Sequence, residues 1–164
     1  MKEKNLKIGG TFTFELVRDG QIVDSWSQDN IVVDTGLNYI LDAALSAATQ
    51  KTTFYLGLFS NNYTPITTTI ITSLTEVTTI YDEAARPTWV EAGVSAKTIT
   101  NAASPASFTF NAGGTIYGAF LCDLATKGDT ASTVVIAASK FASSRAVLAS
   151  DVLNVTYALA ASST

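Results

Sequence analysis

The sequence predicts a single all-β domain, a β-sandwich or barrel, with one short amphipathic helix at about residues 35–48. Three observations lead to this prediction. Runs of β-branched and aromatic residues recur at roughly 8–12-residue spacing, with turn residues between them. One stretch has the periodicity of a helix instead. The 164 residues fit one domain and contain no internal repeat and no domain linker.

The chain opens with a hairpin. Residues 11–26 read TFTFELVRDGQIVDSW, and Phe12, Phe14 and Leu16 share one face by alternation. Asp19 and Gly20 form a dipeptide that favours the type I′ turn of a two-residue hairpin loop. We expect residues 1–9 to form a flexible N-terminal arm, followed by a sandwich domain over residues 10–160.

The helix follows from an apolar stripe at i, i+3, i+4, i+7 and i+8. Asp34 or Thr35 can accept a hydrogen bond as N-cap, and the turns that follow are rich in Ala and Leu, which favour helices. We expect the stripe to be buried against a sheet. Its members are Leu37, Ile40, Leu41, Ala44 and Leu45.

The remaining strands are short. Residues 51–59, KTTFYLGLF, carry apolar side chains on both faces, as a strand covered on both sides does. Residues 60–88 lack clean alternation and predict an irregular excursion or a loosely paired edge. Further strand candidates are WVEAGVSAKTIT, SFTFNA, TIYGAFLCDL, TVVIAASKF, AVLA and DVLNVTYALA.

Composition excludes several classes of protein. Net charge is −4, and the few basic residues near the N-terminus form no patch that would favour nucleic acid. No apolar run is long enough to span a membrane, and the first residues do not resemble a signal peptide. The single cysteine, Cys122, is expected to be a buried free thiol.

The sequence contains no recognisable catalytic motif. It has no histidine, which removes the commonest general base and zinc ligand. A carboxylate pair among Asp82, Glu83 and Glu91 could in principle cleave glycosides, but a solvated charge cluster is the simpler interpretation. Asp123 and Asp129 could hold calcium, but they match no EF-hand spacing. We therefore expect no enzyme activity, no cofactor and no metal.

The order of several short motifs resembles a known family. An N-terminal hairpin is followed by GLNYILDAAL, TTFYLGLF, EAARPTW, GAFLCDLATKGDT and finally RAVLASDVLNVTYAL. This arrangement resembles the small head-associated proteins of tailed bacteriophages, of the cement or decoration type. The resemblance covers residues 12 to about 160 and implies an antiparallel, jelly-roll-like β-sandwich.

The resemblance also implies a function. It predicts a virion structural protein made in the host cytoplasm that binds the major capsid protein on the head surface, as a dimer or trimer, and stabilises the assembled shell. The alternative is a receptor- or carbohydrate-binding module of a phage tail, which would use Trp89 and Tyr63. No partnership with nucleic acid or membrane is expected.

We expect the subunit interface to involve the N-terminal arm and the irregular segment, because neither belongs to the clean strand pattern. Exposed Thr- and Ile-rich backbone can add a strand to a neighbouring sheet. The candidate interface residues are Lys2, Lys4, Lys7, Tyr63, Ile66, Ile70, Ile71, Tyr81 and Trp89.

Overall fold

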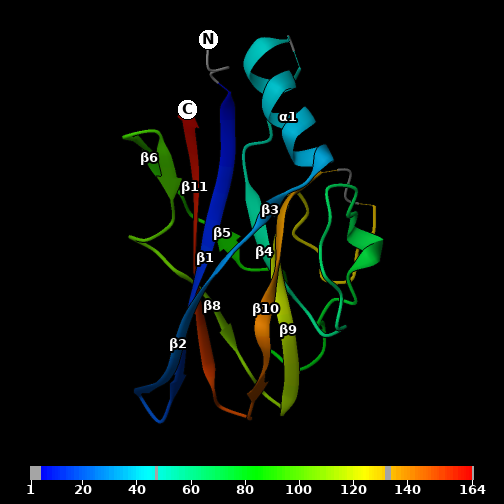
Figure 1. The fold of residues 1–164 in the computed structure, drawn as a ribbon. Coiled ribbons are helices and arrows are strands. Elements are labelled where there is room, and N and C mark those ends of the chain that lie inside the picture. The colour runs from blue at the N-terminus through cyan, green and yellow to red at the C-terminus, as the bar shows by residue number, and fades with distance from the viewer. Residues whose placement is uncertain (1–4, 47, 132–133, 164) are drawn as a thin grey trace.

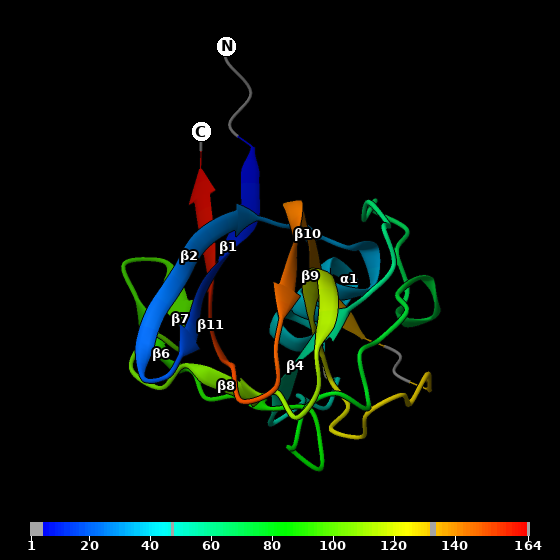
Figure 2. The same ribbon diagram turned by 90° about the horizontal axis from the view of Figure 1, so that it is seen from below.

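A computed structural model describes residues 5–46, 48–131 and 134–163 of the chain. Two antiparallel sheets pack face to face, and an α-helix, the only one within these described ranges, extends from one end of the molecule (Figure 1). The view from below separates the two layers (Figure 2). The predicted fold class, an antiparallel jelly-roll-like β-sandwich with one short helix, is confirmed.

The first sheet has the strand order β2-β1-β11-β7-β6, and β8 pairs with another part of β11. β1 and β11 pair over nearly their whole length, from Leu6 opposite Ser163 to Val17 opposite Val152. The strands are β1 (Leu6–Arg18), β2 (Gln21–Asp29), β6 (Ala92–Ser95), β7 (Thr98–Thr100), β8 (Ala106–Thr109) and β11 (Val152–Ser163).

The second sheet has the order β3-β10-β9-β4-β5. Its long central strands alternate apolar side chains between the sandwich interior and the outer face, as the motif at residues 51–59 predicted. The strands are β3 (Ile31–Val32), β4 (Phe54–Phe59), β5 (Thr88–Trp89), β9 (Gly114–Cys122) and β10 (Val135–Val147).

The N-terminal hairpin is confirmed, but the predicted arm is wrong from residue 6 onward. Asp19 and Gly20 both have positive φ, 50° and 76°, as a type I′ turn requires. β1 begins at Leu6, not at residue 10, because the last residues of β11 supply a pairing partner for this stretch. Residues 1–4 lie outside the described part of the chain.

The main core lies between the sheets. Phe12, Phe14 and Leu16 point inward from β1, as their alternation predicted. Phe14 stacks on Trp26 with ring centroids 5.0 Å apart and meets the edge of Phe141 of β10 at 4.7 Å. These aromatic contacts join the two layers and fix the register of the sheets against each other.

On the outer face of the second sheet, two phenylalanine rings lie over glycines of the neighbouring strand. Gly57 is opposite Phe120, and Phe59 is opposite Gly118. A Cβ atom at either glycine would collide with the ring of its partner, so no larger residue fits there. The two pairs make a flat apolar surface over β4 and β9.

The irregular segment, residues 60–88, covers this surface. It contains a short 3₁₀ helix, η1 (Ile71–Ser73), and the strand β5 begins at its end. Ile71 and Leu74 are buried against Phe59 and Phe120. The predicted irregular excursion therefore closes a second, smaller core, which irregular backbone builds without any sequence periodicity.

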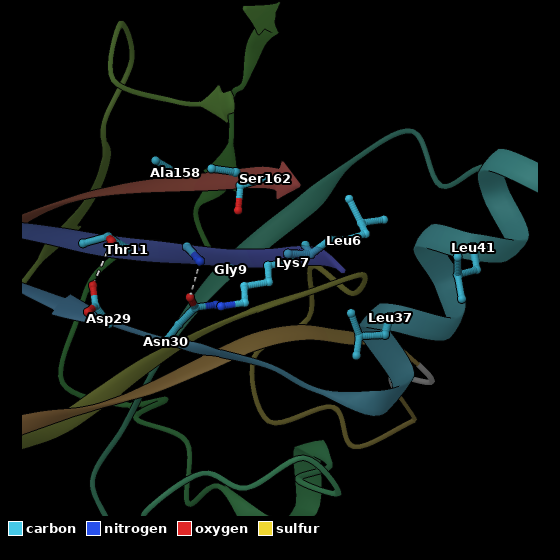
Figure 3. Close-up of a pocket in the computed structure, with 13 residues that line it drawn as sticks. Leu6, Lys7, Gly9, Thr11, Asp29, Asn30, Leu37, Leu41, Ala158 and Ser162 are labelled. Atoms are coloured by element: carbon cyan, nitrogen blue, oxygen red, sulfur yellow. Dashed lines mark hydrogen bonds between the residues drawn. The ribbon is translucent and has the colours of Figure 1, made fainter. Parts of the chain in front are cut away.

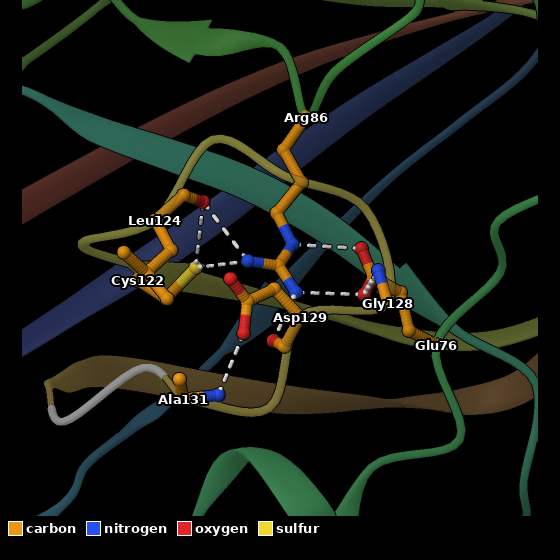
Figure 4. Close-up of polar contacts among 7 residues, drawn as sticks. All are labelled: Glu76, Arg86, Cys122, Leu124, Gly128, Asp129 and Ala131. Carbon is orange, nitrogen blue, oxygen red and sulfur yellow. Dashed lines mark hydrogen bonds and ion pairs between the residues drawn. The ribbon is translucent and has the colours of Figure 1, made fainter.

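Arg86 ties the covering segment to the loop after β9 (Figure 4). Its side chain is buried, and its guanidinium donates two hydrogen bonds to the Glu76 carboxylate, at 2.8 and 2.7 Å. It also donates to the carbonyl oxygens of Leu124 and Asp129, at 2.9 and 3.0 Å. A buried cation with a bidentate carboxylate and two carbonyl partners makes a directional clamp.

The helix α1 (Asp34–Leu45) overlaps the predicted region, residues 35–48, but begins one residue earlier and ends three residues earlier, and its environment differs from the prediction. Val33, and not Asp34 or Thr35, occupies the N-cap position, and its aliphatic side chain makes no cap hydrogen bond; the Thr35 hydroxyl donates to the carbonyl of Val135. Gly36 is the helix residue that is buried. Among the described residues, no helix has the length and apolarity needed to cross a membrane.

The apolar stripe of α1 is not buried as predicted. Leu41 is 51% exposed and Leu45 is 83% exposed. The first turn packs on β10, where a Cβ atom at Gly36 would collide with the Ile136 backbone, and the later turns extend past the end of the sheets (Figure 1). Periodicity shows that these residues share a face, but the sheet is too short to cover it.

Candidate binding groove

A wide groove opens at the end of the sandwich where β1 begins and β11 ends (Figure 3). Its volume is about 910 Å³. The start of β1, residues 6–11, and alternate residues of β11 form one side, while Leu37 and Leu41 of α1 form the other. Asp29 and Asn30 lie at its inner end, where β2 finishes. A groove beside β-strands and lined mainly by apolar side chains suits a protein ligand.

Exposed apolar side chains gather around this groove. Leu45, Val94 and Leu6 are 83%, 70% and 67% exposed, the highest values among the large hydrophobic residues that the structure describes. Leu6 and Leu41 line the groove, and Leu45 follows Leu41 by one turn on the same face of α1. Solvent-exposed apolar residues that cluster at one place mark interaction surfaces.

A smaller apolar pocket of about 240 Å³ lies next to the groove. Ile8, Ile40 and Val94 contribute to its walls, so it joins β1, the helix and the β6–β7 hairpin. Lys97, at the tip of that hairpin, lies at the same pocket and has a φ of 66°. The groove and this pocket together make the apolar end of the molecule, a surface formed by β1 residues 6–10, α1 and Val94.

Asn30 fixes where the groove begins. Its side-chain oxygen accepts a hydrogen bond from the Gly10 N–H at 2.7 Å, and its own N–H donates to the Gly10 carbonyl at 3.1 Å. Its amide nitrogen also donates to the Tyr157 hydroxyl at 2.9 Å. Burial raises the pKa of the Tyr157 phenol, so the hydroxyl stays neutral. A Cβ atom at Gly10 would collide with Tyr157 and the Ala158 carbonyl, so glycine is required here.

The groove carries little charge. Asp29 is the one acid among its described lining residues, and it accepts a hydrogen bond from the Thr11 hydroxyl at 3.0 Å. Lys7 is exposed and makes no ion pair with a described residue. Its described lining residues therefore include no pair of acids for acid–base chemistry, and its chemistry is that of an apolar surface with one cation, Lys7, and one anion, Asp29.

The structure places the candidate interface residues in different settings. Lys7 lies in the groove, whereas Lys2 and Lys4 lie outside the described residues. Ile66 and Ile70 are exposed on the covering segment. The Tyr63 hydroxyl lies 3.0 Å from the Thr69 hydroxyl, so its ring is held partly against the fold.

Three of those residues cannot form an interface. Ile71 and Tyr81 belong to the covering segment, and their side chains are buried, Ile71 in the second core and Tyr81 in the main core against Phe108. Trp89 is buried as well, and its indole N–H donates to the Tyr157 carbonyl at 3.2 Å. Trp89 therefore cannot stack on a sugar, and the carbohydrate-binding alternative loses its main residue.

The acids considered for catalysis hold backbone and side-chain amides instead. Glu83 accepts from the Thr109 N–H at 3.1 Å, and Asp82 accepts from the Asn111 side chain at 2.7 Å. Glu91 follows β5 in the sequence, and its side chain is exposed. Hydrogen bonds to the loop near β8 thus account for the first two carboxylates.

The loop considered for calcium is engaged by protein cations. Lys51 forms an ion pair with the Asp123 carboxylate at 3.1 Å, and the Arg86 guanidinium donates a hydrogen bond to the Asp129 carbonyl. No group of three or more metal-ligating side chains occurs within residues 5–46, 48–131 and 134–163. Cys122 is the predicted buried free thiol, and burial raises its pKa to about 11.

Sequence reasoning missed the groove because it assumed that the helix stripe was covered. One signal was available: Leu6 and Ile8 continue the alternation of Phe12 and Phe14 toward the N-terminus. The two glycines between them, Gly9 and Gly10, hid this pattern. No family model matches the sequence, and no curated protein is significantly similar to it.

Proposed function

We propose that this chain is a structural protein of a tailed-phage virion, a cement or decoration protein that binds the outside of the assembled head. The order of sequence motifs described above supports this assignment. The observation that carries it is the apolar end: the most exposed large apolar side chains that the structure describes surround a groove of about 910 Å³, with one lysine that makes no ion pair with a described residue. Such a surface fits a protein partner.

The mechanism is linkage between binding and assembly. A protein that binds the assembled shell, and not its free subunits, shifts the equilibrium toward the shell by mass action. Many copies on one particle add their small contributions, and an oligomeric cement protein engages several shell subunits at once. The partner is then the major capsid protein, and the location is the virion surface.

The test is binding to capsids assembled, without this chain, from the genome of a phage that encodes it. We expect the chain to co-sediment with these capsids and to raise their disruption temperature, whereas free capsid subunits should not bind. A Leu41→Asp, Leu45→Asp double variant should lose co-sedimentation while its own melting temperature decreases only slightly. Binding that is undiminished in this variant would remove the apolar end from the interface.

If the wild-type chain does not bind capsids, the cement assignment fails. Detection of the chain in purified tails by mass spectrometry would then assign it to the tail. The mass of the free chain in solution tests the accompanying proposal of a dimer or trimer, and a monomeric mass across the accessible concentration range would contradict it.

A further inference from the structure

β1 has a free edge along the groove. β2 pairs with β1 as far as Thr11 opposite Asp29, and the chain then turns away at Asn30. Asn30 satisfies both backbone groups of Gly10 through its side chain and its N–H. Nearer the N-terminus, no described strand occupies the position beside β1 that β2 has left.

The backbone of Leu6 and Ile8 points toward this empty position. In an antiparallel strand, successive residues direct their N–H and C=O groups to opposite sides. Gly10 directs both groups to the side of β2, so Ile8 and Leu6 do the same, while the groups of Gly9 and Lys7 face Ala160 and Ser162 of β11. The edge therefore offers a repeating donor and acceptor pattern that matches another extended backbone.

A strand added beside this edge would have different surroundings on its two faces. Leu37 and Leu41 of α1 face it across the groove (Figure 3). Lys7 lies on the opposite face of β1 from Ile8, as does Thr11, which bonds to Asp29 on the outer surface of the sheet. A strand placed here would direct alternate side chains to the apolar helix and the others to the side of Lys7.

We propose that the free edge of β1 receives an extended segment of the shell subunit as an added strand. The segment would carry apolar residues at alternate positions, facing Leu37 and Leu41, and an acidic residue next to Lys7. Charge complementarity supports the acid, because Lys7 makes no ion pair with a described residue. The identity of the partner rests on the proposed function, whereas the pairing itself is tested separately below.

A second copy of this chain fits the edge less well. Its own β1 is already paired with β11 and has α1 beside its free edge, so two such edges would bring helix against helix. A segment that is not part of a sheet can enter between β1 and α1 without this conflict. The proposal therefore commits to a free extended segment of the partner.

The first experiment uses a peptide probe, fluorescently labelled Val-Glu-Val-Thr-Val-Thr with blocked ends, and measures its binding by anisotropy. Two matched probes are N-methylated at the odd or at the even positions. Because only alternate amides face β1, we expect one methylated probe to lose binding and the other to keep it. Equal binding of both methylated probes, or no binding of the parent probe, would overturn the proposal.

Variants of the chain locate the probe. Ile8→Pro removes an N–H that faces the empty edge, and proline is tolerated at such edge positions. Ile8→Ala is the matched control, because it shortens the side chain and keeps the N–H. We expect Ile8→Pro to weaken binding by about five- to tenfold, the worth of one or two hydrogen bonds, and Ile8→Ala by less. Equal weakening by both variants would contradict backbone pairing.

Charge reversal tests the acidic residue of the segment. Lys7→Glu should reverse the preference between the parent probe and a probe with Lys in place of Glu. Lys97→Glu, at the neighbouring pocket, is the control and should leave the preference unchanged. A preference that follows Lys97 instead of Lys7 would place the segment elsewhere.

Capsid binding separates this inference from the proposed function. If the chain binds capsids but Ile8→Pro binds equally well and the probe does not compete, the strand proposal fails and the cement function stands. If the probe pairs with β1 but capsids do not bind, the pairing stands and the cement function fails. A dimer of the free chain that Ile8→Pro dissociates would assign the edge to a second copy and overturn the proposal.

Discussion

Two apolar surfaces lie outside the main core, and the chain treats them differently. The outer face of the second sheet, around Phe59 and Phe120, is covered by residues 60–88 and clamped by Arg86. The apolar end, around Leu6 and Leu41, has no comparable cover among the described residues. A long irregular segment therefore covers one apolar surface, while the other stays exposed to solvent. Exposed apolar surfaces of this kind are typical of interaction sites.

Removing the clamp should have the largest effect on stability. Arg86→Ala leaves the Glu76 carboxylate without its guanidinium and frees two carbonyls, so we expect the free energy of unfolding to fall by about 3–5 kcal/mol. Urea denaturation measures this change. Arg145→Ala is the control, because Arg145 pairs with Asp24 at a partly exposed position and should cost about 1 kcal/mol or less. Similar losses from both variants would mean that the buried Arg86 interactions stabilise the fold no more than a partly exposed ion pair does.

The neighbours Ile70 and Ile71 divide the covering segment into an outer and an inner side. Ile71 is 5% exposed and Ile70 is 50% exposed. Ile71→Ser removes a buried side chain and should lower the free energy of unfolding by about 3 kcal/mol, whereas Ile70→Ser should cost less than about 1 kcal/mol. Thermal melting compares them. The reverse order would show that the segment covers the sheet with its other face.

Cys122 reports whether the cover opens. Burial raises the pKa of its thiol from 9.0 to about 11, so at pH 8 the thiolate is about a hundredfold scarcer than in an exposed thiol. We expect a thiol reagent to react with the native chain at least about a hundredfold more slowly than with the unfolded chain. Rapid labelling in the native state would mean that the cover is open.

The same thiol makes stability depend on pH. The pKa of the Cys122 thiol is higher in the folded chain than in the unfolded chain. The contribution of the protonated thiol to the free energy of unfolding is therefore complete below pH 9 and decreases as the pH rises from about 9 to about 11. Cys122→Ala should remove this part of the alkaline loss, which denaturation at several pH values would measure. An unchanged slope over this range would assign the loss to other groups.

The smallest stability effect is expected at the open surface. Leu41→Asp places a charge on a side chain that is already half exposed, so the free energy of unfolding should fall by about 1 kcal/mol or less. The sequence alone predicts a buried stripe and hence a severe loss. A large decrease in melting temperature would restore that prediction and show that α1 is covered.

The contrast between the two surfaces also explains what the sequence could predict. The hairpin turn at Asp19 and Gly20 and the two-sided strand at 51–59 were predictable, because turn chemistry and alternation are local. Burial of Ile71 and Tyr81 was not, because irregular backbone has no period that assigns side chains to a face. The Arg86 clamp joins Glu76, Leu124 and Asp129, and contacts between such distant loops leave no local signal.

The candidate site was predictable only in part. Lys7 was selected for its charge, and the structure places it in the groove. Leu37 and Leu41 were recognised as one helix face, but periodicity does not reveal whether a face has a partner. The free edge of β1 depends on where β2 ends, and that point is set by the contact between Asn30, Gly10 and Tyr157.

The pairing of β1 with β11 has a practical consequence for fusions. Leu6 lies opposite Ser163, so polypeptide attached at either end of the chain leaves the molecule beside the groove. The turn at Asp19 and Gly20 lies at the far end of the same strand pair. An affinity tag or a displayed epitope inserted in this turn would therefore point away from the apolar end, whereas a terminal fusion would lie beside it.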